Sequence, residues 1–434
     1  MEKTKSRRLQ ITFESLIDQE PEAAADQTGK KKQAGGASKG RVWEFIAIAT
    51  IPMVLVLGNS MLIPILPDMV AELGISDFQS SLVITLFSVT AGLFIPVSGF
   101  LSDRFSRKAV IIPSLILYGA AGVLAGFGAI WNSYGILIGA RALQGMGAAG
   151  TAPIAMALVG DLYDGATESK ALGLTEASNG TGKVLSPIIG AALALIVWYA
   201  AFFAFPVFCT ISLLAVLFIL KEPAREEKPP RLAQYIHTTL SILKEKARWL
   251  ITSFFAGALA LFILFGVLFY LSQILEKPPY SIDGILKGLV LAIPLLGMVI
   301  TSYTTGAFIK KDGKLMRRLM LTGLSLMTVC LAAAIFLNTY LYLFIGLLTL
   351  SSIGTGLVLP CLNTMITGSV QKGERGMITS LYSSLRFLGV AAGPPLFELM
   401  MNRSSVLVFI TVSSLAFVTL GLVFFLIRPE GEIA

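Results

Sequence analysis

Twelve predominantly apolar stretches, each of about 20 residues or more, constrain this chain more than any other feature. A helix rises ~1.5 Å per residue, so a stretch of this length crosses the ~30 Å hydrocarbon core of a bilayer. The stretches are apolar on nearly all sides instead of alternating, which excludes a membrane β-barrel. They lie at residues 43–66, 79–101, 109–130, 134–160, 170–196, 198–220, 249–273, 284–308, 316–337, 340–367, 376–401 and 404–427.

The composition agrees with a chain that lies mostly in lipid. Charged residues make up 14% of the sequence, whereas soluble domains carry about 25%. So few charges cannot cover a water-facing surface. The predicted fold class is therefore an all-α integral membrane protein with 12 transmembrane helices, which has the lipid bilayer as a partner.

Several short sequences recur 207 positions farther along the chain. One offset shared by separate places indicates that a large unit has been duplicated. We therefore expect two pseudo-symmetric six-helix bundles. The matched pairs are Gly182–Pro187 with Gly389–Pro394, Gly99–Lys108 with Gly306–Leu315, Gly147 with Gly354, and Pro153 with Pro360.

Lysine and arginine are concentrated in alternate loops. With the N-terminus in the cytoplasm, 28 of the 34 Lys and Arg residues fall in cytoplasmic segments, and two, Lys277 and Arg403, fall outside. Cytoplasmic loops carry such an excess, so we predict a multi-pass protein of the cell membrane with both termini in the cytoplasm. The net charge of +8 then lies beside the inner leaflet and gives no case for nucleic-acid binding.

The predicted organisation has five parts. In the linker between the bundles, apolar residues from Leu232 to Leu243 recur at helical spacing, which predicts a short interfacial helix. The parts are a disordered cytoplasmic tail (1–41), an N-terminal bundle (42–220), the cytoplasmic linker (221–248), a C-terminal bundle (249–428) and a second cytoplasmic tail (429–434).

Residue types needed for metal, disulfide or nucleotide chemistry are sparse. Cys209, Cys330 and Cys361 lie in separate apolar stretches, and the one histidine, His237, lies in the linker. The sequence holds no P-loop pattern. We therefore predict no metal, no cofactor and no disulfide, and we do not expect an enzyme.

Four motifs lie in the first five apolar stretches. The motifs are Gly99-x-Leu101-Ser102-Asp103-Arg104-x-Ser106-Arg107-Lys108, Leu137-x-x-x-Arg141-x-x-Gln144-Gly145-x-Gly147, Gly182-x-x-x-Ser186-Pro187-x-x-Gly190, and Leu57-Gly58 followed by Pro64-x-x-Pro67. Their order and placement resemble the major facilitator superfamily, and within it the twelve-span drug:proton antiporters.

Charges cluster in the loop after the second stretch. Basic residues that only set the topology would explain Arg107 and Lys108, but not an aspartate among them. The second copy of the motif has Lys310 at the position of Asp103, which predicts an asymmetric arrangement. The resemblance implies a latch that joins the bundles on the cytoplasmic side, formed by Gly99, Asp103, Arg104, Arg107 and Lys108.

Glycines and prolines recur in the fifth and eleventh stretches. They let helices approach closely and bend, which a rocking carrier requires and which ordinary helix packing also uses. The predicted packing and hinge positions are Gly182, Pro187, Gly190, Gly389, Gly393 and Pro394.

Polar residues inside the apolar stretches indicate function. A charge at mid-bilayer costs about 2.5–3.5 kcal/mol, so it needs a partner or a water-filled cavity. Glu176, Asn179 and Lys183 share one helix face, and Arg386 is the repeat-equivalent of Asn179. We expect these residues to line a cavity between the bundles; buried pairs that orient helices are the alternative. Lys287, near the outer end of the eighth stretch, is expected to snorkel.

Two roles are assigned to these polar residues. Glu176 is the candidate proton carrier because the apolar stretches contain no histidine, and the resemblance implies a part for Arg141 in the proton relay. The cations suit a solute with anionic groups, such as a siderophore, although amphipathic drugs remain open. Substrate binding is assigned to Lys183, Arg386, Asn179, Asn59 and Gln144.

The predicted function is a proton-coupled antiporter that exports small organic molecules by alternating access, as a monomer. An importer or lipid-linked flippase of the same fold is one alternative. A receptor or scaffold that transports nothing is another, although it would not need Lys183 and Arg386 inside the membrane.

Overall fold

The computed structural model describes residues 34–163, 165–220, 222, 232–309, 312–368 and 372–428. The described residues from Trp43 onward belong to the compact unit discussed below, and residues 34–42 belong to a separate unit. Ten helices within the described residues are long and apolar enough to cross a membrane. The other two predicted stretches coincide with α8 and α15, helices of 30 residues each.

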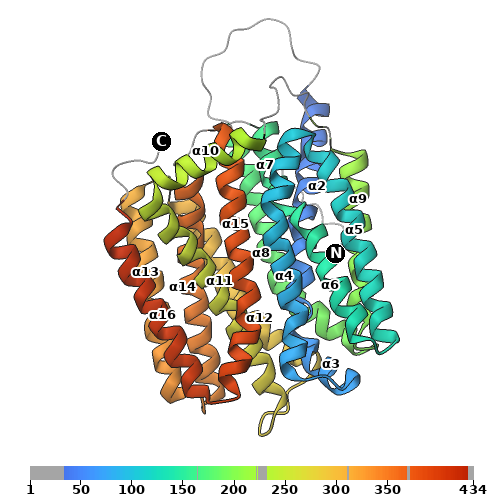
Figure 1. The fold of residues 1–434 in the computed structure, drawn as a ribbon, viewed down its shortest axis with the longest axis vertical. Coiled ribbons are helices and arrows are strands. Elements are labelled where there is room, and N and C mark those ends of the chain that lie inside the picture. Colours follow the sequence, from blue (N-terminus) through green and yellow to red (C-terminus); the bar gives the residue numbers. More distant parts are fainter. Residues whose placement is uncertain are drawn as a thin grey trace, which may run out of the picture. The chain divides into compact units, whose positions relative to one another are not determined.

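The regular elements of the described chain are helices (Figure 1). The first half contains α2 (Ala34–Ser60), η1 (Ile63–Ile65), α3 (Leu66–Leu73), α4 (Asp77–Arg104), α5 (Arg107–Ile130), α6 (Tyr134–Ala149), α7 (Ala152–Leu162), α8 (Gly165–Ala194) and α9 (Ala200–Phe218). The second half contains α10 (Leu232–Glu245), α11 (Ala247–Glu276), α12 (Gly284–Phe308), α13 (Gly313–Leu337), α14 (Leu341–Gly368), α15 (Lys372–Met401) and α16 (Ser405–Leu426).

The offset found in the sequence recurs in the positions of the helices. Helices α4 and α12 begin at Asp77 and Gly284, and α6 and α14 begin at Tyr134 and Leu341. Both pairs of starting residues are 207 positions apart, because 284 − 77 and 341 − 134 each give 207. Helices α8 and α15 keep the same spacing at both ends. The duplication therefore governs where helices begin as well as which motifs recur.

The two halves also pack in the same way. In the first half α5 packs against α6 and α9, and in the second half the equivalent α13 packs against α14 and α16. Two extensive contacts join the halves, α4 with α15 and α12 with α8. The repeat converts one contact into the other, since α4 corresponds to α12 and α8 to α15. We call these two contacts the seams.

A repeat-equivalent glycine pair shows why the halves match. A Cβ added to Gly147 would lie 2.8 Å from the carbonyl oxygen of Ser114 on α5, and one added to Gly354 would lie 2.5 Å from that of Gly323 on α13. No side chain fits at either place. Glycine therefore allows α6 to pack closely on α5, and α14 on α13.

Side-chain caps fix several helix starts. Ser76 and Gln79 form a capping box at the start of α4, with hydrogen bonds of 3.1 and 2.9 Å. Ser106 caps α5 by accepting from the amide of Ala109 at 3.0 Å. Its backbone is extended, a conformation that any residue adopts, so serine fits this motif position without strain.

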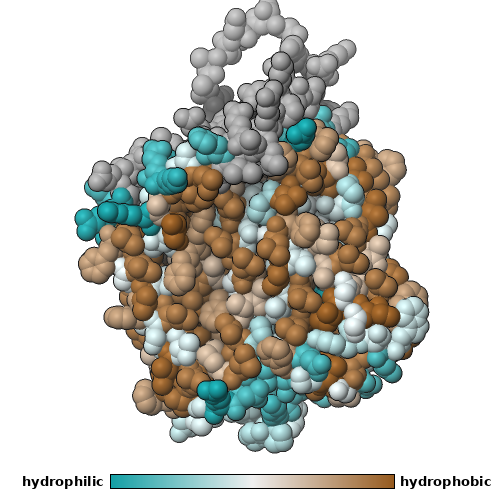
Figure 2. Space-filling view, in the orientation of Figure 1, coloured by the Kyte–Doolittle hydropathy of each residue, from teal (hydrophilic) through white to brown (hydrophobic). Residues whose placement is uncertain are grey.

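The outer surface is apolar around the helices. Figure 2 shows hydrophobic residues along their length and hydrophilic ones gathered toward the ends. Exposed side chains such as Leu93, Phe218 and Phe336 belong to this surface. A soluble protein does not expose so large an apolar band, so the fold is that of a multi-pass membrane protein.

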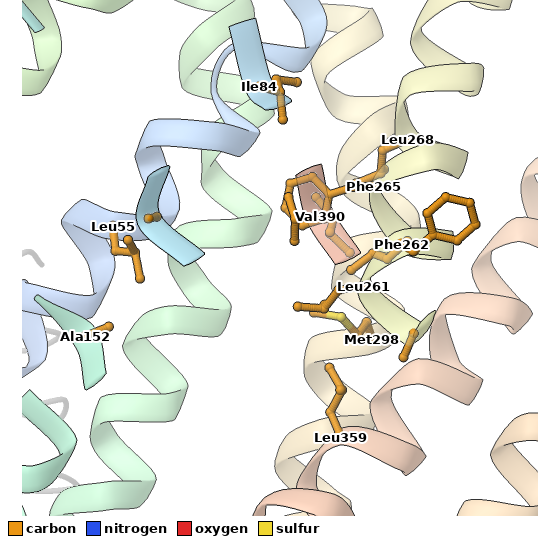
Figure 3. Packing of buried hydrophobic residues seen from close by; sticks show 14 of the residues in the cluster. Leu55, Ile84, Ala152, Leu261, Phe262, Phe265, Leu268, Met298, Leu359 and Val390 are labelled. Carbon is orange, nitrogen blue, oxygen red and sulfur yellow. The ribbon is translucent and has the colours of Figure 1, made fainter. Parts of the chain in front are cut away.

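The buried apolar cluster includes residues from both halves. Figure 3 shows Leu55 and Ala152 of the first half, and Leu261, Met298 and Leu359 of the second. Figure 1 shows α10 at one end of the helices and α3 at the other. We call the end with α10 the linker face and the end with η1 and α3 the far face.

Parts of the predicted organisation fall outside the described residues: 1–33 of the first tail, most of 221–231 in the linker, and 429–434. Residues 34–41, which the sequence assigns to a disordered tail, are helical. The short helix α10 occupies the position expected for the interfacial helix.

Candidate functional site

Arg141 on α6 lies at the centre of a buried polar network in the first half. Its side chain is 0% exposed. It donates from Nε to the carbonyl of Val83 at 3.0 Å and from Nη2 to the carbonyl of Gly58 at 3.0 Å. The guanidinium also lies 4.4 Å above the ring of Phe87. Arg141 thus joins α2, α4 and α6 through a fixed fork of donors.

Asn59 and Gln144, both predicted site residues, complete this network. Arg141 donates to Oδ1 of Asn59 at 3.2 Å and to Oε1 of Gln144. Asn59 donates in turn to Ser88 at 2.9 Å. Among the side chains that the structure describes, no carboxylate lies within ion-pair distance of Arg141. Its positive charge is therefore held by neutral acceptors and an aromatic ring.

The other predicted cations lie on α8 and α15. Arg386 donates to Asn363 at 3.4 Å and lies 5.3 Å from the ring centre of Tyr382. The Nε of Arg386 and the Oδ1 of its repeat-equivalent Asn179 are buried, and neither has a hydrogen-bond partner. Lys183 is partly buried. Each bundle thus offers a polar atom that a bound molecule could satisfy.

The predicted proton carrier, Glu176, lies within α8. Its side chain is outside the part of the chain whose side chains the structure describes. Its role as proton carrier therefore stays a prediction.

Arg107 organises the charged motif on the linker face. It donates to Asp103 at 2.6 Å and to Asp161 at 2.7 Å, and it also reaches Ser102 at 2.7 Å. Since Asp161 lies at the end of α7, these bonds tie α4, α5 and α7 together within the first half. Gly99 supplies the carbonyl that accepts from Ser102 at 2.8 Å.

The carboxylate of Asp103 also faces the second half. A Cβ added to Gly376, in the second turn of α15, would lie 3.5 Å from Oδ2 of Asp103. A carboxylate near a helix N-terminus is favourable because the helix dipole is positive there. Arg104 is exposed, and Lys310, the counterpart of Asp103, lies outside the described residues.

Glu222 holds the start of α5. Its two carboxylate oxygens accept from the amides of Arg107 at 2.5 Å and of Lys108 at 3.1 Å. Lys108 donates from Nζ to the carbonyl of Leu220 at 2.8 Å. The sequence prediction missed Glu222 and Asp161, because both reach the motif from distant parts of the chain.

Three of the predicted packing glycines allow backbones to touch. A Cβ on Gly190 would meet the carbonyl of Met61, and one on Gly389 would meet the carbonyl of Ala258. One on Gly393 would lie 3.0 Å from the carbonyl of Phe262. Pro187 and Pro394 lie inside α8 and α15.

Gly182 is in a different environment. A Cβ there would make only ordinary contact with Met53, at 3.5 Å. Close packing therefore does not require glycine at this position.

Lys287 does not snorkel to the interface, so that expectation was wrong. Its side chain is 1% exposed, and its ammonium group lies 3.0 Å from the carboxylate of Glu276. It also donates to the carbonyl of Pro64 at 2.6 Å. These two partners hold the ammonium inward, against the tendency of lysine to reach water.

A buried carboxylate, Glu398 on α15, was also missed. It is 4% exposed, and its Oε1 accepts from Asn402 at 3.0 Å. The signal was present in the sequence, since Glu398 lies within the eleventh predicted stretch.

The family described as Major Facilitator Superfamily matches residues 48–311 and 277–433. The bacillibactin exporter of Bacillus subtilis is 43% identical over 389 residues, covering 89% of this chain and 96% of that protein. A multidrug efflux protein of the same bacterium is 28% identical, covering 85% of this chain and 89% of its own.

Solved structures agree with the fold. The human organic anion transporter MFSD10 superposes with a TM-score of 0.70 at 20% identity, covering 88% of this chain and 99% of its own. A bacterial homologue of the lysosomal transporter Spinster, in an inward-facing and unoccupied conformation, gives 0.69 at 14% identity, with coverage of 92% and 98%. These relatives are transporters, and the chain is a transporter that belongs to the major facilitator superfamily.

Proposed function

We propose that this protein is a proton-coupled antiporter that exports small organic molecules from the cell by alternating access. It acts as a monomer in the cell membrane, with the linker face and both termini in the cytoplasm. The observation that carries the proposal is the equivalence of the two seams. Because the repeat relates α4–α15 to α12–α8, the bundles can pivot about them with little internal change.

The seams have the close packing that a pivot needs. Ser384 of α15 donates to the carbonyl of Gly92 of α4 at 2.6 Å. On the other seam, a Cβ on Gly288 of α12 would lie 2.6 Å from the carbonyl of Pro187 of α8. Small residues therefore bring the helices of the two halves into backbone contact.

The solute that we propose is anionic or amphipathic, with a siderophore as the first candidate. Lys183 and Arg386 supply positive charge, and Asn179, Asn59 and Gln144 supply neutral polar groups. The unpartnered Nε of Arg386 supports this role, because a buried donor without a partner is costly until something binds it. The relative that exports bacillibactin makes that compound the first to test.

The proton path that we propose uses Glu176 and Arg141, with Glu398 as a second carboxylate. A carboxylate inside the membrane can exist neutral or charged, so it can carry a proton between states. Arg141, held by neutral acceptors, would stabilise the charged form of a nearby carboxylate.

The latch on the linker face is also part of the proposal. Asp103 lies beside the beginning of α15 and accepts from Arg107, so it can hold the halves together while that face is closed. Opening the linker face would separate Asp103 from α15.

Flux in proteoliposomes tests the proposal. Purified protein is reconstituted with bacillibactin or an amphipathic drug inside, and an imposed pH gradient, acidic outside, should drive the solute out. Collapse of the gradient with a protonophore should abolish this gradient-driven efflux. A receptor would give no flux, and an importer would move the solute in the other direction.

A further inference from the structure

Three side chains of the second half bind the first half at the far face. Lys287 of α12 donates to the carbonyl of Pro64 at 2.6 Å, and Ser272 of α11 donates to the carbonyl of Ile63 at 3.0 Å. Both acceptors belong to η1. Nearby, Gln273 of α11 donates to Asp77, the first residue of α4, at 3.3 Å.

Pro67 makes the carbonyl of Ile63 available. In an α-helix the carbonyl of Ile63 would accept from the amide of residue 67, but Pro67 has no N–H. The chain instead forms the 3₁₀-helix η1, in which the carbonyl of Ile63 accepts from the amide of Leu66. A carbonyl oxygen has a second lone pair, and Ser272 donates to it. The Pro64-x-x-Pro67 motif therefore presents acceptors to the other half.

Glu276 positions the lysine. Its carboxylate lies 3.0 Å from the ammonium group of Lys287. The two residues belong to the same half, so this ion pair does not itself join the bundles. Instead it compensates a buried charge and directs the ammonium group toward Pro64. Asp68 of α3 and Asp283 before α12 add negative charge around the same ammonium group.

We propose that Lys287 and Ser272, with Glu276 as a positioning residue, form a far-face latch on the carbonyls of η1. This latch keeps the bundles together at the far face, and it must break before the carrier can open there to release its solute. The inference rests on the proposed alternating access. The inference assigns a role to the Pro64-x-x-Pro67 motif and to Lys287, neither of which belongs to the charged motif on the linker face.

Distances between spin labels test the far-face latch. Ala71 on α3 and Leu286 on α12 are exposed, one in each half, and are replaced by labelled cysteines after the three native cysteines have been removed. Lys287→Met should raise the ratio of far-face-open to far-face-closed molecules about tenfold or more, because it removes a buried, charge-assisted hydrogen bond. Lys277→Met removes an exposed lysine on the same face and should leave the ratio unchanged.

A double variant separates the latch from a local charge effect. Lys287→Met leaves Glu276 without its cation, whereas Lys287→Met with Glu276→Met removes both charges. The double variant should keep the open population, because the bond to Pro64 is still missing. A return to the wild-type ratio would show that the unpaired carboxylate caused the shift, and the far-face latch would be wrong.

Ser272→Ala provides a milder test that leaves every charge in place. It should shift the ratio in the same direction by a few-fold. Ser253→Ala is its matched control, because Ser253 is a buried serine on the same helix whose Oγ has no hydrogen-bond partner. Equal behaviour of the two serine variants would contradict the proposal.

The wild-type protein distinguishes this inference from the proposed function. If its labels give one far-face distance with and without a pH gradient and bacillibactin, alternating access itself fails. If the wild type shows two distances but Lys287→Met and Ser272→Ala keep its ratio, only the far-face latch fails.

Discussion

The guanidinium group of Arg107 lies 2.7 Å from the carboxylate of Asp161, so the start of α5 is tied to the end of α7. Arg107 is buried and also binds Asp103 at 2.6 Å, whereas Arg104, three positions earlier, is exposed. The two arginines of this motif therefore have different structural roles. Arg107 holds the first half together, and Arg104 faces solvent.

Arg107→Ala should lower the free energy of unfolding by about 1–3 kcal/mol, because two carboxylates lose their cation. Arg104→Ala should change it by less than about 0.5 kcal/mol. Thermal unfolding of both purified variants in one detergent makes the comparison. An equal loss in the two variants would remove the structural role assigned to Arg107.

Arg141→Leu should abolish transport and leave the fold intact. The repeat-equivalent of Arg141 is Leu348, since 348 − 141 = 207, and Leu348 is fully buried in α14. The same scaffold is thus built with leucine in the other half, so folding does not require the arginine. Far-ultraviolet circular dichroism measures whether the helical fold is intact, and proteoliposome flux measures transport.

Leu348→Met is the control for this substitution, because it conserves volume at the equivalent site and should keep most transport. Arg141→Lys should fail nearly as badly as Arg141→Leu, since lysine lacks the planar fork that reaches four acceptors. Full transport by either Arg141 variant would exclude a role in coupling.

Alanine at two pairs of repeat-equivalent glycines in α6 and α14 should change protein stability in opposite directions. Gly147→Ala and Gly354→Ala should destabilise by about 1–3 kcal/mol, because the added carbon meets backbone. Gly139→Ala and Gly346→Ala should stabilise by about 0.5–1 kcal/mol, because nothing lies within 4 Å of the added carbon.

The four glycine variants control one another, since 346 − 139 and 354 − 147 both give 207. In thermal unfolding, Gly147→Ala should resemble Gly354→Ala, and Gly139→Ala should resemble Gly346→Ala, although each pair is divided between the two halves. A ranking by half would contradict the equivalent packing of α6 and α14.

Glu176→Gln should decouple transport from protons. We expect the variant to lose accumulation driven by a pH gradient and to retain exchange of labelled for unlabelled solute without a gradient. Glu398→Gln should slow gradient-driven flux about tenfold or more if its carboxylate lies on the same path.

Glu72→Gln, an exposed change on α3, should leave both measurements unaffected. If both Glu176→Gln and Glu398→Gln show normal gradient-driven flux, neither carboxylate carries the coupled proton.

Hydrophobic run length and the repeat predicted most of the fold. Ten predicted stretches coincide with membrane-length helices, because crossing lipid demands a long apolar helix whatever its neighbours are. The 207-residue offset could be found in the sequence for a different reason. Glycines such as Gly147 and Gly354 are needed at both repeat-equivalent places, because two helix backbones touch there.

Partners across the interior were not predictable from one sequence. Lys287 was expected to snorkel because its own stretch places it near a helix end, yet its partners Pro64 and Glu276 belong to other helices. Asp161 and Glu222 were missed in the same way, since the chain brings them to Arg107 from 54 and 115 positions away.

The network around Arg141 was only partly visible. The resemblance indicated Arg141 and its motif neighbour Gln144, whereas Asn59 was assigned to substrate binding and not to a contact with Arg141. The bonds to the carbonyls of Gly58 and Val83 depend on how α2 and α4 cross α6, which no local pattern encodes.

A cation that lacks a described counter-ion within the membrane makes the carrier electrically sensitive. Moving one elementary charge through the whole membrane potential is worth ~2.3 kcal/mol per 100 mV, so displacement of Arg141 through a tenth of the field is worth about 0.2 kcal/mol per 100 mV. If the first half tilts against the second, Arg141 moves with it. The balance between the two orientations should then respond to voltage, even for a solute without charge.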